Sequence, residues 1–167
     1  MTHATRKLTG KLPWTRSCFV CGESNPHGLH SRSRIEDGRV MLDYTTRESD
    51  RGYRHIMHGG IAVTLLDEVM TWAAISATGR VCVAAELGAR LKQPIRVPEQ
   101  LRVEGWTTRV TSRLIMTEGR IIGPDGAERL TATGKYVPMP EDQLELTEKD
   151  FVLSGDTIPP KEIMGGH

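Results

Sequence analysis

Residues 59–76, GGIAVTLLDEVMTWAAIS, decide the fold of this 167-residue chain. The stretch contains no proline, is long for a strand and is rich in Leu, Ala, Met and Glu, so it predicts a helix. At about 100° per residue, one broad side is apolar: Ala62, Leu65, Leu66, Val69, Met70 and Ala73. A narrow polar stripe lies opposite: Gly60, Thr64, Asp67, Glu68 and Thr71. We expect a buried helix with one polar seam.

Strand-like runs lie on both sides of this helix. Before it, Asp37-Gly38 leads into an alternating stretch, residues 39–46, which predicts a hairpin. After it come four runs that we expect to form a meander of antiparallel strands: residues 81–92, 101–110, 114–122 and 129–137. Because the helix can bury its broad apolar side only inside a curved sheet, the fold class is predicted as α+β, with an antiparallel β-sheet wrapped around one long central helix.

The two ends of the chain differ from this middle part. Residues 1–17 are polar and basic, and residues 139–167 carry several prolines and a Gly165-Gly166 pair. We therefore expect a single domain at residues 18–138, an N-terminal extension at 1–17 and a C-terminal tail at 139–167. Both flanks are predicted to lie outside the core.

Composition narrows the partners and the compartment. With 22 basic and 21 acidic residues the net charge is +1, so bulk charge predicts neither a nucleic-acid nor a membrane partner. There is no run of eighteen apolar residues, and the N-terminus lacks the apolar core of a signal peptide. The odd count of three cysteines suits a reducing compartment. We expect a cytoplasmic protein.

The helix start, His58-Gly59-Gly60, is the first candidate for chemistry. Unpaired backbone N–H groups and the positive end of the helix dipole attract an anion or a developing oxyanion. Glycines leave those N–H groups open to close approach by a substrate carbonyl. Two alternatives stay open: Gly59 and Gly60 form only a turn, and His58, a general base by residue type, only caps or packs the helix end.

Asp67 is the second candidate, with Thr71 one turn further along the helix. Asp67 lies eight residues after Gly59, about 12 Å along the axis, so one chain does not easily bring both to the same reacting atom. Two antiparallel neighbouring helices in a dimer would. The alternative for the Asp67-Glu68 pair is a solvated helix face, and for Thr71 and Thr64 a hydrogen bond back to a helix carbonyl.

One cysteine-histidine set has zinc-ligand chemistry. Cys18 and Cys21 form a CxxC pair, and His27 and His30 follow, the first of them only six residues after Cys21. This spacing is tighter than that of usual zinc motifs, and free cysteines are more often small buried residues. We predict no metal and no cofactor.

The motifs for several other chemistries are absent from the sequence. It contains no GxxxxGK[ST] loop, no GxSxG elbow and no GxGxxG following a strand. The sequence therefore does not point to nucleotide hydrolysis, serine-esterase chemistry or dinucleotide-dependent redox chemistry.

Three stretches together resemble one family. They are CFVCGESNPHGL (18–29), DRGYRHIMHGGIAVTLLDE (50–68) and AELGARLKQPI (85–95). They are similar to the PaaI-like branch of hotdog-fold acyl-CoA thioesterases over about residues 17–138. The most specific feature is HGG followed by an apolar helix with a carboxylate at the ninth position after the His, here Asp67.

The resemblance implies roles for these residues. Asp67 would be the catalytic nucleophile or general base, and the Gly59 N–H of the other subunit would polarise the thioester carbonyl. Thr71 assists in some members, and Glu68 is a neighbour of the active carboxylate. Arg51 stands where many relatives carry Gln or Asn before a glycine. With His58, Gly60 and Thr71 it completes the expected substrate-binding set.

The sequence thus predicts an acyl-CoA thioesterase that works as a homodimer, with a dimer of dimers left open. Two alternatives remain. One is a non-catalytic acyl-CoA-binding hotdog module, and the other is a hydroxyacyl-thioester dehydratase built around His58.

Overall fold

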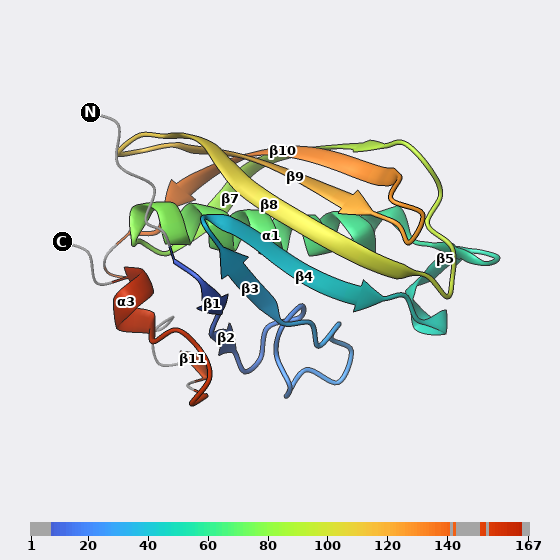
Figure 1. The fold of residues 1–167 in the computed structure, drawn as a ribbon, viewed down its shortest axis with the longest axis horizontal. Helices are drawn as coiled ribbons and strands as arrows, with labels where there is room; N and C mark the ends of the chain where they lie inside the picture. The colour runs from blue at the N-terminus through green and yellow to red at the C-terminus, as the bar shows by residue number, and fades with distance from the viewer. Residues whose placement is uncertain (1–7, 141, 143–150, 153, 165–167) are drawn as a thin grey trace.

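A single helix, α1 (Gly59–Thr78), lies against one face of a seven-stranded antiparallel sheet (Figure 1). The structure, a computed structural model, describes residues 8–140, 142, 151–152 and 154–164. The strands in sheet order are β1 (Gly10–Lys11), β3 (Ser33–Glu36), β4 (Arg39–Thr45), β8 (Gln100–Val110), β9 (Ile115–Ile122), β10 (Glu128–Pro138) and β7 (Cys82–Leu91). This arrangement confirms the predicted fold class.

Helix α1 is defined by its two caps and its apolar side. The His58 ring accepts a hydrogen bond from the Gly60 N–H at the start, and Gly79 ends the helix in a left-handed conformation (φ 69°), a cap that glycine favours. All six residues of the predicted apolar side are buried. By length and composition α1 could cross a membrane, but 56% of its apolar 18-residue window is buried within this domain, so it is a core helix.

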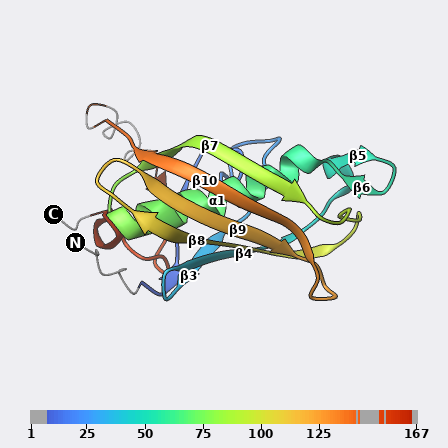
Figure 2. The ribbon, with the colours of Figure 1, turned by 90° about the horizontal axis from the view of Figure 1, so that it is seen from above.

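Glycines let the sheet approach α1 closely. A Cβ on Gly119 of β9 would come within 3.0 Å of side-chain atoms of Leu66 and Met70. A Cβ on Gly105 of β8 would lie 2.9 Å from the Val69 carbonyl carbon. The lack of side chains at these positions allows the central strands to curve around the helix, as Figure 2 shows from above.

The position of β7 differs from the predicted meander. Strands β8, β9 and β10 do follow one another, but β7 pairs with β10 and not with β8. The chain from β7 to β8 crosses the end of the sheet through residues 92–99. Hydrophobic alternation shows which face of a strand is buried, whereas it does not specify the neighbouring strand. As a result β7 is an edge strand, and one of its sides pairs with no other strand among the described residues.

The predicted hairpin before the helix is confirmed. Strands β3 and β4 pair antiparallel across Asp37 and Gly38. Both residues have positive φ, 48° and 82°, as a tight hairpin turn requires. Short elements then lead to α1: a 3-10 turn (Glu48–Asp50), β5 (Arg51–Tyr53) and β6 (Ile56–Met57).

The flanking segments are less peripheral than predicted. Strand β1 extends the sheet beside β3, and Leu12 is almost fully buried (1% exposed). The strands β2 (Trp14–Thr15) and β11 (Phe151–Val152) pair, and the helix α3 (Pro160–Met164) buries Ile163. The described parts of both flanks therefore cover one end of the α1 core.

Candidate active site

Asp67 lies midway along α1, where its carboxylate meets β10. The Tyr136 hydroxyl donates to Asp67 Oδ1 at 2.7 Å, and the Thr71 hydroxyl donates to the same oxygen at 3.4 Å. Within the described residues, Oδ2 receives no hydrogen bond. One carboxylate oxygen is therefore held in place, while the other is free to meet a ligand.

Tyr136 is the site residue that the sequence analysis missed. Its side chain is fully buried (0% exposed) at the end of the inward-facing alternation Leu130, Ala132, Gly134, Tyr136 of β10. Burial, then the adjacent Asp67 carboxylate, raises the pKa of Tyr136, so the hydroxyl stays protonated and donates. The sequence signal for Tyr136 is a hydroxyl group at an inward-facing position of β10 whose neighbouring inward positions are apolar. Its hydrogen-bond partner, Asp67, belongs to α1.

The backbone N–H groups at the start of α1 differ in whether they have a hydrogen-bond acceptor. The Gly60 N–H is taken by His58 Nδ1 (3.0 Å), and the Ile61 N–H by the His58 carbonyl oxygen (3.0 Å). Among the described residues, the Gly59 N–H has no hydrogen-bond acceptor. The capping alternative thus holds for the His58 ring, and Gly59 keeps the first-turn N–H available to a ligand.

Arg51 lies beside this helix start in β5. Its guanidinium forms an ion pair with Glu48 at 2.9 Å and donates to the Glu48 carbonyl oxygen at 3.1 Å. The strand passes over His58, because a Cβ on Gly52 would come 3.1 Å from the His58 Cα. Arg51 is exposed, so its remaining N–H groups face solvent next to the Gly59 region.

The Glu68 side chain does not point along the polar stripe on which the helical pattern placed it. Its carboxylate accepts from Trp72 Nε1 at 3.2 Å and faces the loop that carries Cys18 and Cys21. Burial, followed by the Cys18 sulfur, raises the pKa of Glu68 to about 7. The side chains of neighbouring helical residues point about 100° apart. Because of this angle, Asp67 and Glu68 face different surroundings.

The candidate cysteine-histidine set is not brought together. His30 Nε2 contacts the Asn25 carbonyl oxygen at 2.6 Å, and His27 is exposed. Across the described residues, the group whose donor atoms are close enough to hold a metal is Cys18, Cys21 and Glu68. Spacing along the chain suggested the histidines, whereas folding replaces them with a carboxylate from α1.

The hydroxyl groups of Thr64 and Thr71 have different hydrogen-bond acceptors. The Thr64 hydroxyl donates to the Gly60 carbonyl oxygen at 2.9 Å, the back-bonding that the sequence analysis kept open. The Thr71 hydroxyl instead turns to the Asp67 carboxylate. Only Thr71 of this pair is thus placed to orient Asp67.

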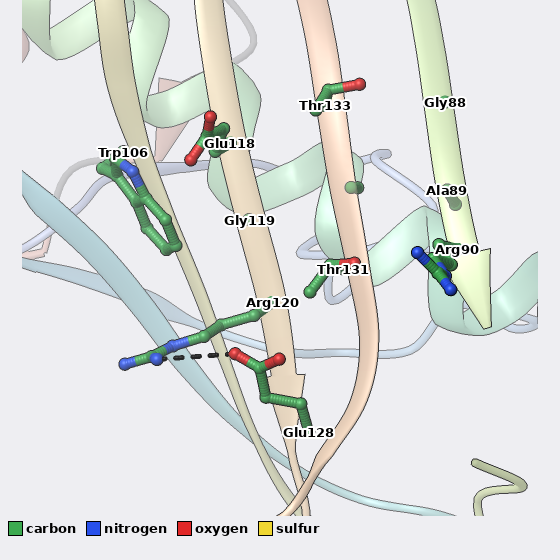
Figure 3. A pocket seen from close by; sticks show the side chains of 11 residues that line it. Gly88, Ala89, Arg90, Trp106, Glu118, Gly119, Arg120, Glu128, Thr131 and Thr133 are labelled. Carbon is green, nitrogen blue, oxygen red and sulfur yellow. Dashed lines mark ion pairs between the residues drawn. The ribbon is translucent and has the colours of Figure 1, made fainter. Parts of the chain in front are cut away.

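Two of the hollows in the described part of the molecule, both outside the Asp67 environment, differ in their distance from the helix start. One of about 580 Å³ is on the face of the sheet away from α1 (Figure 3), because Gly119 faces α1 and its neighbours Glu118 and Arg120 point the other way. Arg120 there pairs with Glu128 at 3.6 Å. The other, of about 370 Å³, adjoins the start of α1 and is lined in part by Phe19, Leu29 and Ile61. The second is the one close to Gly59.

A long helix held inside an antiparallel sheet, with a carboxylate at its middle and glycines at its start, defines a hotdog-fold protein. Residues 55–129 match the family model of the thioesterase superfamily. This segment begins before α1 and ends in β10, so it spans the site. This match confirms the resemblance to hotdog-fold thioesterases seen in the sequence.

Solved structures share this fold. A crystal structure of a thioesterase superfamily protein has a TM-score of 0.68 and 28% identity over 73% of this chain and 60% of that chain, so this chain spans less than two thirds of that protein. The PaaI protein of the E. coli phenylacetic acid degradation operon has a TM-score of 0.62 and 15% identity, over 67% and 81% of the two chains.

A third structure, a Streptococcus mutans protein bound to acetyl-CoA, has a TM-score of 0.60 and 18% identity over 63% of this chain and 84% of that chain. At such identities, the likeness to the last two structures shows the fold alone. No curated protein matches the chain.

Proposed function

We propose that this protein is an acyl-CoA thioesterase that hydrolyses a thioester to a free acid and CoA. The observation that carries the proposal is the state of the Asp67 carboxylate, which is held through Oδ1 by Tyr136 and Thr71 with Oδ2 left free. The match of residues 55–129 to the thioesterase superfamily model supports the reaction class. The acetyl-CoA and CoA bound to two structural neighbours support the choice of CoA as carrier.

In the proposed mechanism the thioester carbonyl oxygen accepts a hydrogen bond from the Gly59 N–H at the positive end of α1. Charge that develops on this oxygen is stabilised there. Asp67 Oδ2 either attacks the carbonyl carbon, forming an anhydride that water then cleaves, or removes a proton from the attacking water. Both routes consume one water and release the acid and the CoA thiol.

The proposed site requires two subunits. Gly59 and Asp67 are about 12 Å apart along the axis of one helix. Strand β7 offers a ten-residue edge that has no partner strand in the described part of the chain. Leu91 and Val83 on this strand are exposed apolar residues. Antiparallel pairing of two β7 edges would set two α1 helices side by side, with the start of each opposite the middle of the other.

The register of this pairing follows from helix and strand geometry. Gly59 is level with Leu91, because a Cβ on Gly59 would come 3.1 Å from Leu91 Cδ2. The rise of about 12 Å to Asp67 corresponds to between three and four strand residues, so Asp67 is about level with Leu87. A two-fold axis near Ala89 would then bring Gly59 of one subunit level with Asp67 of the other.

The remaining substrate-binding roles fit the same interface. Arg51 and the Gly60 region flank the Gly59 N–H, and His58 positions Gly60 through its ring. Because the His58 ring is used as a cap, the dehydratase alternative receives no support from this arrangement. We propose that the protein is cytoplasmic, because CoA thioesters and unpaired cysteines are typical of that compartment. We further propose that it is a homodimer able to form a dimer of dimers.

The test is a free-thiol assay on the purified protein with acetyl-, hexanoyl-, palmitoyl- and aryl-acyl-CoA. We expect CoA release from at least one class of acyl group, with one acid formed for each thiol. If none of the thioesters is cleaved faster than in buffer, while acyl-CoA still binds, the protein is a binding module and the proposal is wrong.

A further inference from the structure

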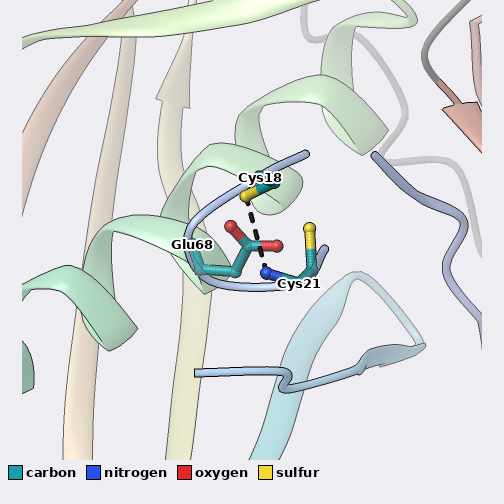
Figure 4. A group of neighbouring side chains, drawn as sticks. All are labelled: Cys18, Cys21 and Glu68. Carbon is teal, nitrogen blue, oxygen red and sulfur yellow. Dashed lines mark hydrogen bonds between the residues drawn. The ribbon is translucent and has the colours of Figure 1, made fainter. Parts of the chain in front are cut away.

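Three potential metal ligands that the proposed reaction does not use meet on the side of α1 away from Asp67. The Cys18 and Cys21 sulfurs and a Glu68 carboxylate oxygen all lie within 4.8 Å of one another. Figure 4 shows the carboxylate pointing toward both cysteines from the helix. Two thiolates and a carboxylate in one place form a donor set that suits a soft divalent cation.

Backbone N–H groups of the loop point at the Cys18 sulfur. The backbone N–H groups of Val20 and Cys21 donate to Cys18 Sγ at 3.3 and 3.5 Å. Such N–H···S contacts stabilise the anionic form in which cysteine binds a metal.

The turn is also tight and fixed to its surroundings. A Cβ on Gly22 would come 2.3 Å from the Arg16 carbonyl oxygen, so only glycine fits there. The Leu29 and Ser31 N–H groups bond the carbonyl oxygens of Phe19 and Val20 at 2.8 and 2.9 Å. The two sulfurs are therefore presented by a defined backbone.

Glu68 provides an independent indication. Its carboxylate is turned into the protein toward the sulfurs, and none of the ion pairs among the described residues includes it. The Trp72 N–H holds Oε1, as outer hydrogen bonds hold carboxylate ligands. An inward-facing carboxylate without a cation is costly, and a metal ion between Glu68 and the sulfurs would remove that cost.

We propose that Cys18, Cys21 and Glu68 form a binding site for a zinc ion. Three protein donors leave the fourth tetrahedral position to a water molecule. Binding releases the protons of the cysteine thiols to the solvent, so affinity falls as the pH falls. The ion would fasten the loop of residues 16–31 to α1, and Phe19 and Leu29 of that loop line the hollow at the helix start.

The test is a titration of the reduced, chelator-treated full-length protein with Co²⁺, a spectroscopic substitute for zinc. We expect one ion per chain, a thiolate-to-cobalt charge-transfer band, and displacement of the cobalt by Zn²⁺. Glu68→Gln, nearly the same size, should weaken Co²⁺ binding by about tenfold or more. Cys18→Ser and Cys21→Ser should abolish the band.

Matched controls separate this site from adventitious binding. Cys82→Ser removes the third cysteine, which contacts Thr78 and not this loop. His30→Ala removes one of the two histidines that follow the CxxC pair. Both variants should keep full binding. The proposal is overturned if the reduced wild type shows no charge-transfer band, or if Glu68→Gln binds Co²⁺ as tightly as the wild type. Circular dichroism of Glu68→Gln checks the fold, and the readout is independent of thioesterase activity.

Discussion

Asp67 and Glu68 are adjacent carboxylates on one helix, yet they face different parts of the molecule. Asp67 meets Tyr136 of β10 and the Thr71 hydroxyl, and keeps one oxygen free. Glu68 meets Trp72 and the Cys18–Cys21 loop. A step of about 100° along α1 is enough to assign one carboxylate to proposed catalysis and its neighbour to a proposed metal site.

The comparison shows that residue type and spacing do not by themselves identify the reacting group. Both side chains are acidic and both fall in the polar stripe of the helical pattern. The two residues differ in the element that each contacts. Asp67 contacts a sheet strand near the open β7 edge, and Glu68 contacts an N-terminal loop. The chemistry of a helical residue is therefore decided by its neighbours in the fold.

The largest expected effect separates the two carboxylates directly. Asp67→Asn removes the proposed nucleophile or base with little change in shape, and kcat should fall by about 10²–10⁴-fold. Glu68→Gln in zinc-saturated protein should keep kcat within about threefold, because its carboxylate does not meet the substrate. Steady-state free-thiol kinetics measures both. Equal losses in the two variants would contradict the division of roles.

A smaller effect is expected at Tyr136. Tyr136→Phe keeps the buried ring and removes a hydrogen bond to a carboxylate, worth about 1.5–3 kcal/mol, so kcat should fall by about tenfold or more. Tyr44→Phe is a matched control, since the buried Tyr44 hydroxyl donates to the carboxylate of Asp50 instead. It should lower the melting temperature while leaving kcat unchanged. An unaffected kcat in Tyr136→Phe would show that Asp67 needs no support from β10.

The Thr71 contact should matter less. At 3.4 Å it is long for a hydroxyl-to-carboxylate bond, so Thr71→Val should reduce kcat only about two- to fivefold. Thr78→Val is the control, because the Thr78 hydroxyl bonds the Ala74 carbonyl oxygen at the far end of α1. A loss at Thr71 as large as that at Asp67 would give Thr71 a direct part in the reaction.

The proposed pairing of two β7 strands predicts which cysteine substitution cross-links the two subunits. This cross-link should have little effect on the rate of hydrolysis. Ala89→Cys should form a disulfide between subunits under mild oxidation, because residue 89 would face its own copy across the two-fold axis, and activity should stay near the wild-type value. Val83→Cys lies about 20 Å along the strand from Ala89 and should not cross-link. Non-reducing electrophoresis distinguishes them. Cross-linking through Val83→Cys alone would require a different register.

The sequence predicted the helix, the hairpin before it and all four later strands within a few residues, because each is a long segment with clear periodicity. It also singled out Gly59 and Asp67 as candidate site residues, because their positions follow from the helix itself. It did not place β7 beside β10, since alternation carries no information about strand neighbours. Tyr136 and the turn of Glu68 toward Cys18 were missed because both depend on contacts between distant segments.

The central claim is that Asp67 acts with Gly59 of the other subunit, and mixed dimers test it most directly. Gly59→Pro removes the N–H at the first helical position, where proline is tolerated, and His58 already has the extended backbone that proline needs before it. Gly59→Ala, which keeps the N–H, is its control and should remain active.

Asp67→Asn and Gly59→Pro proteins, each nearly inactive alone, are unfolded, mixed in equal amounts and refolded together. In a shared site, each mixed dimer holds one complete pair, so random mixing should restore about a quarter of wild-type activity. If Gly59 and Asp67 act within one subunit, no mixed dimer contains a complete site, and the refolded mixture would show no gain over the separate variants.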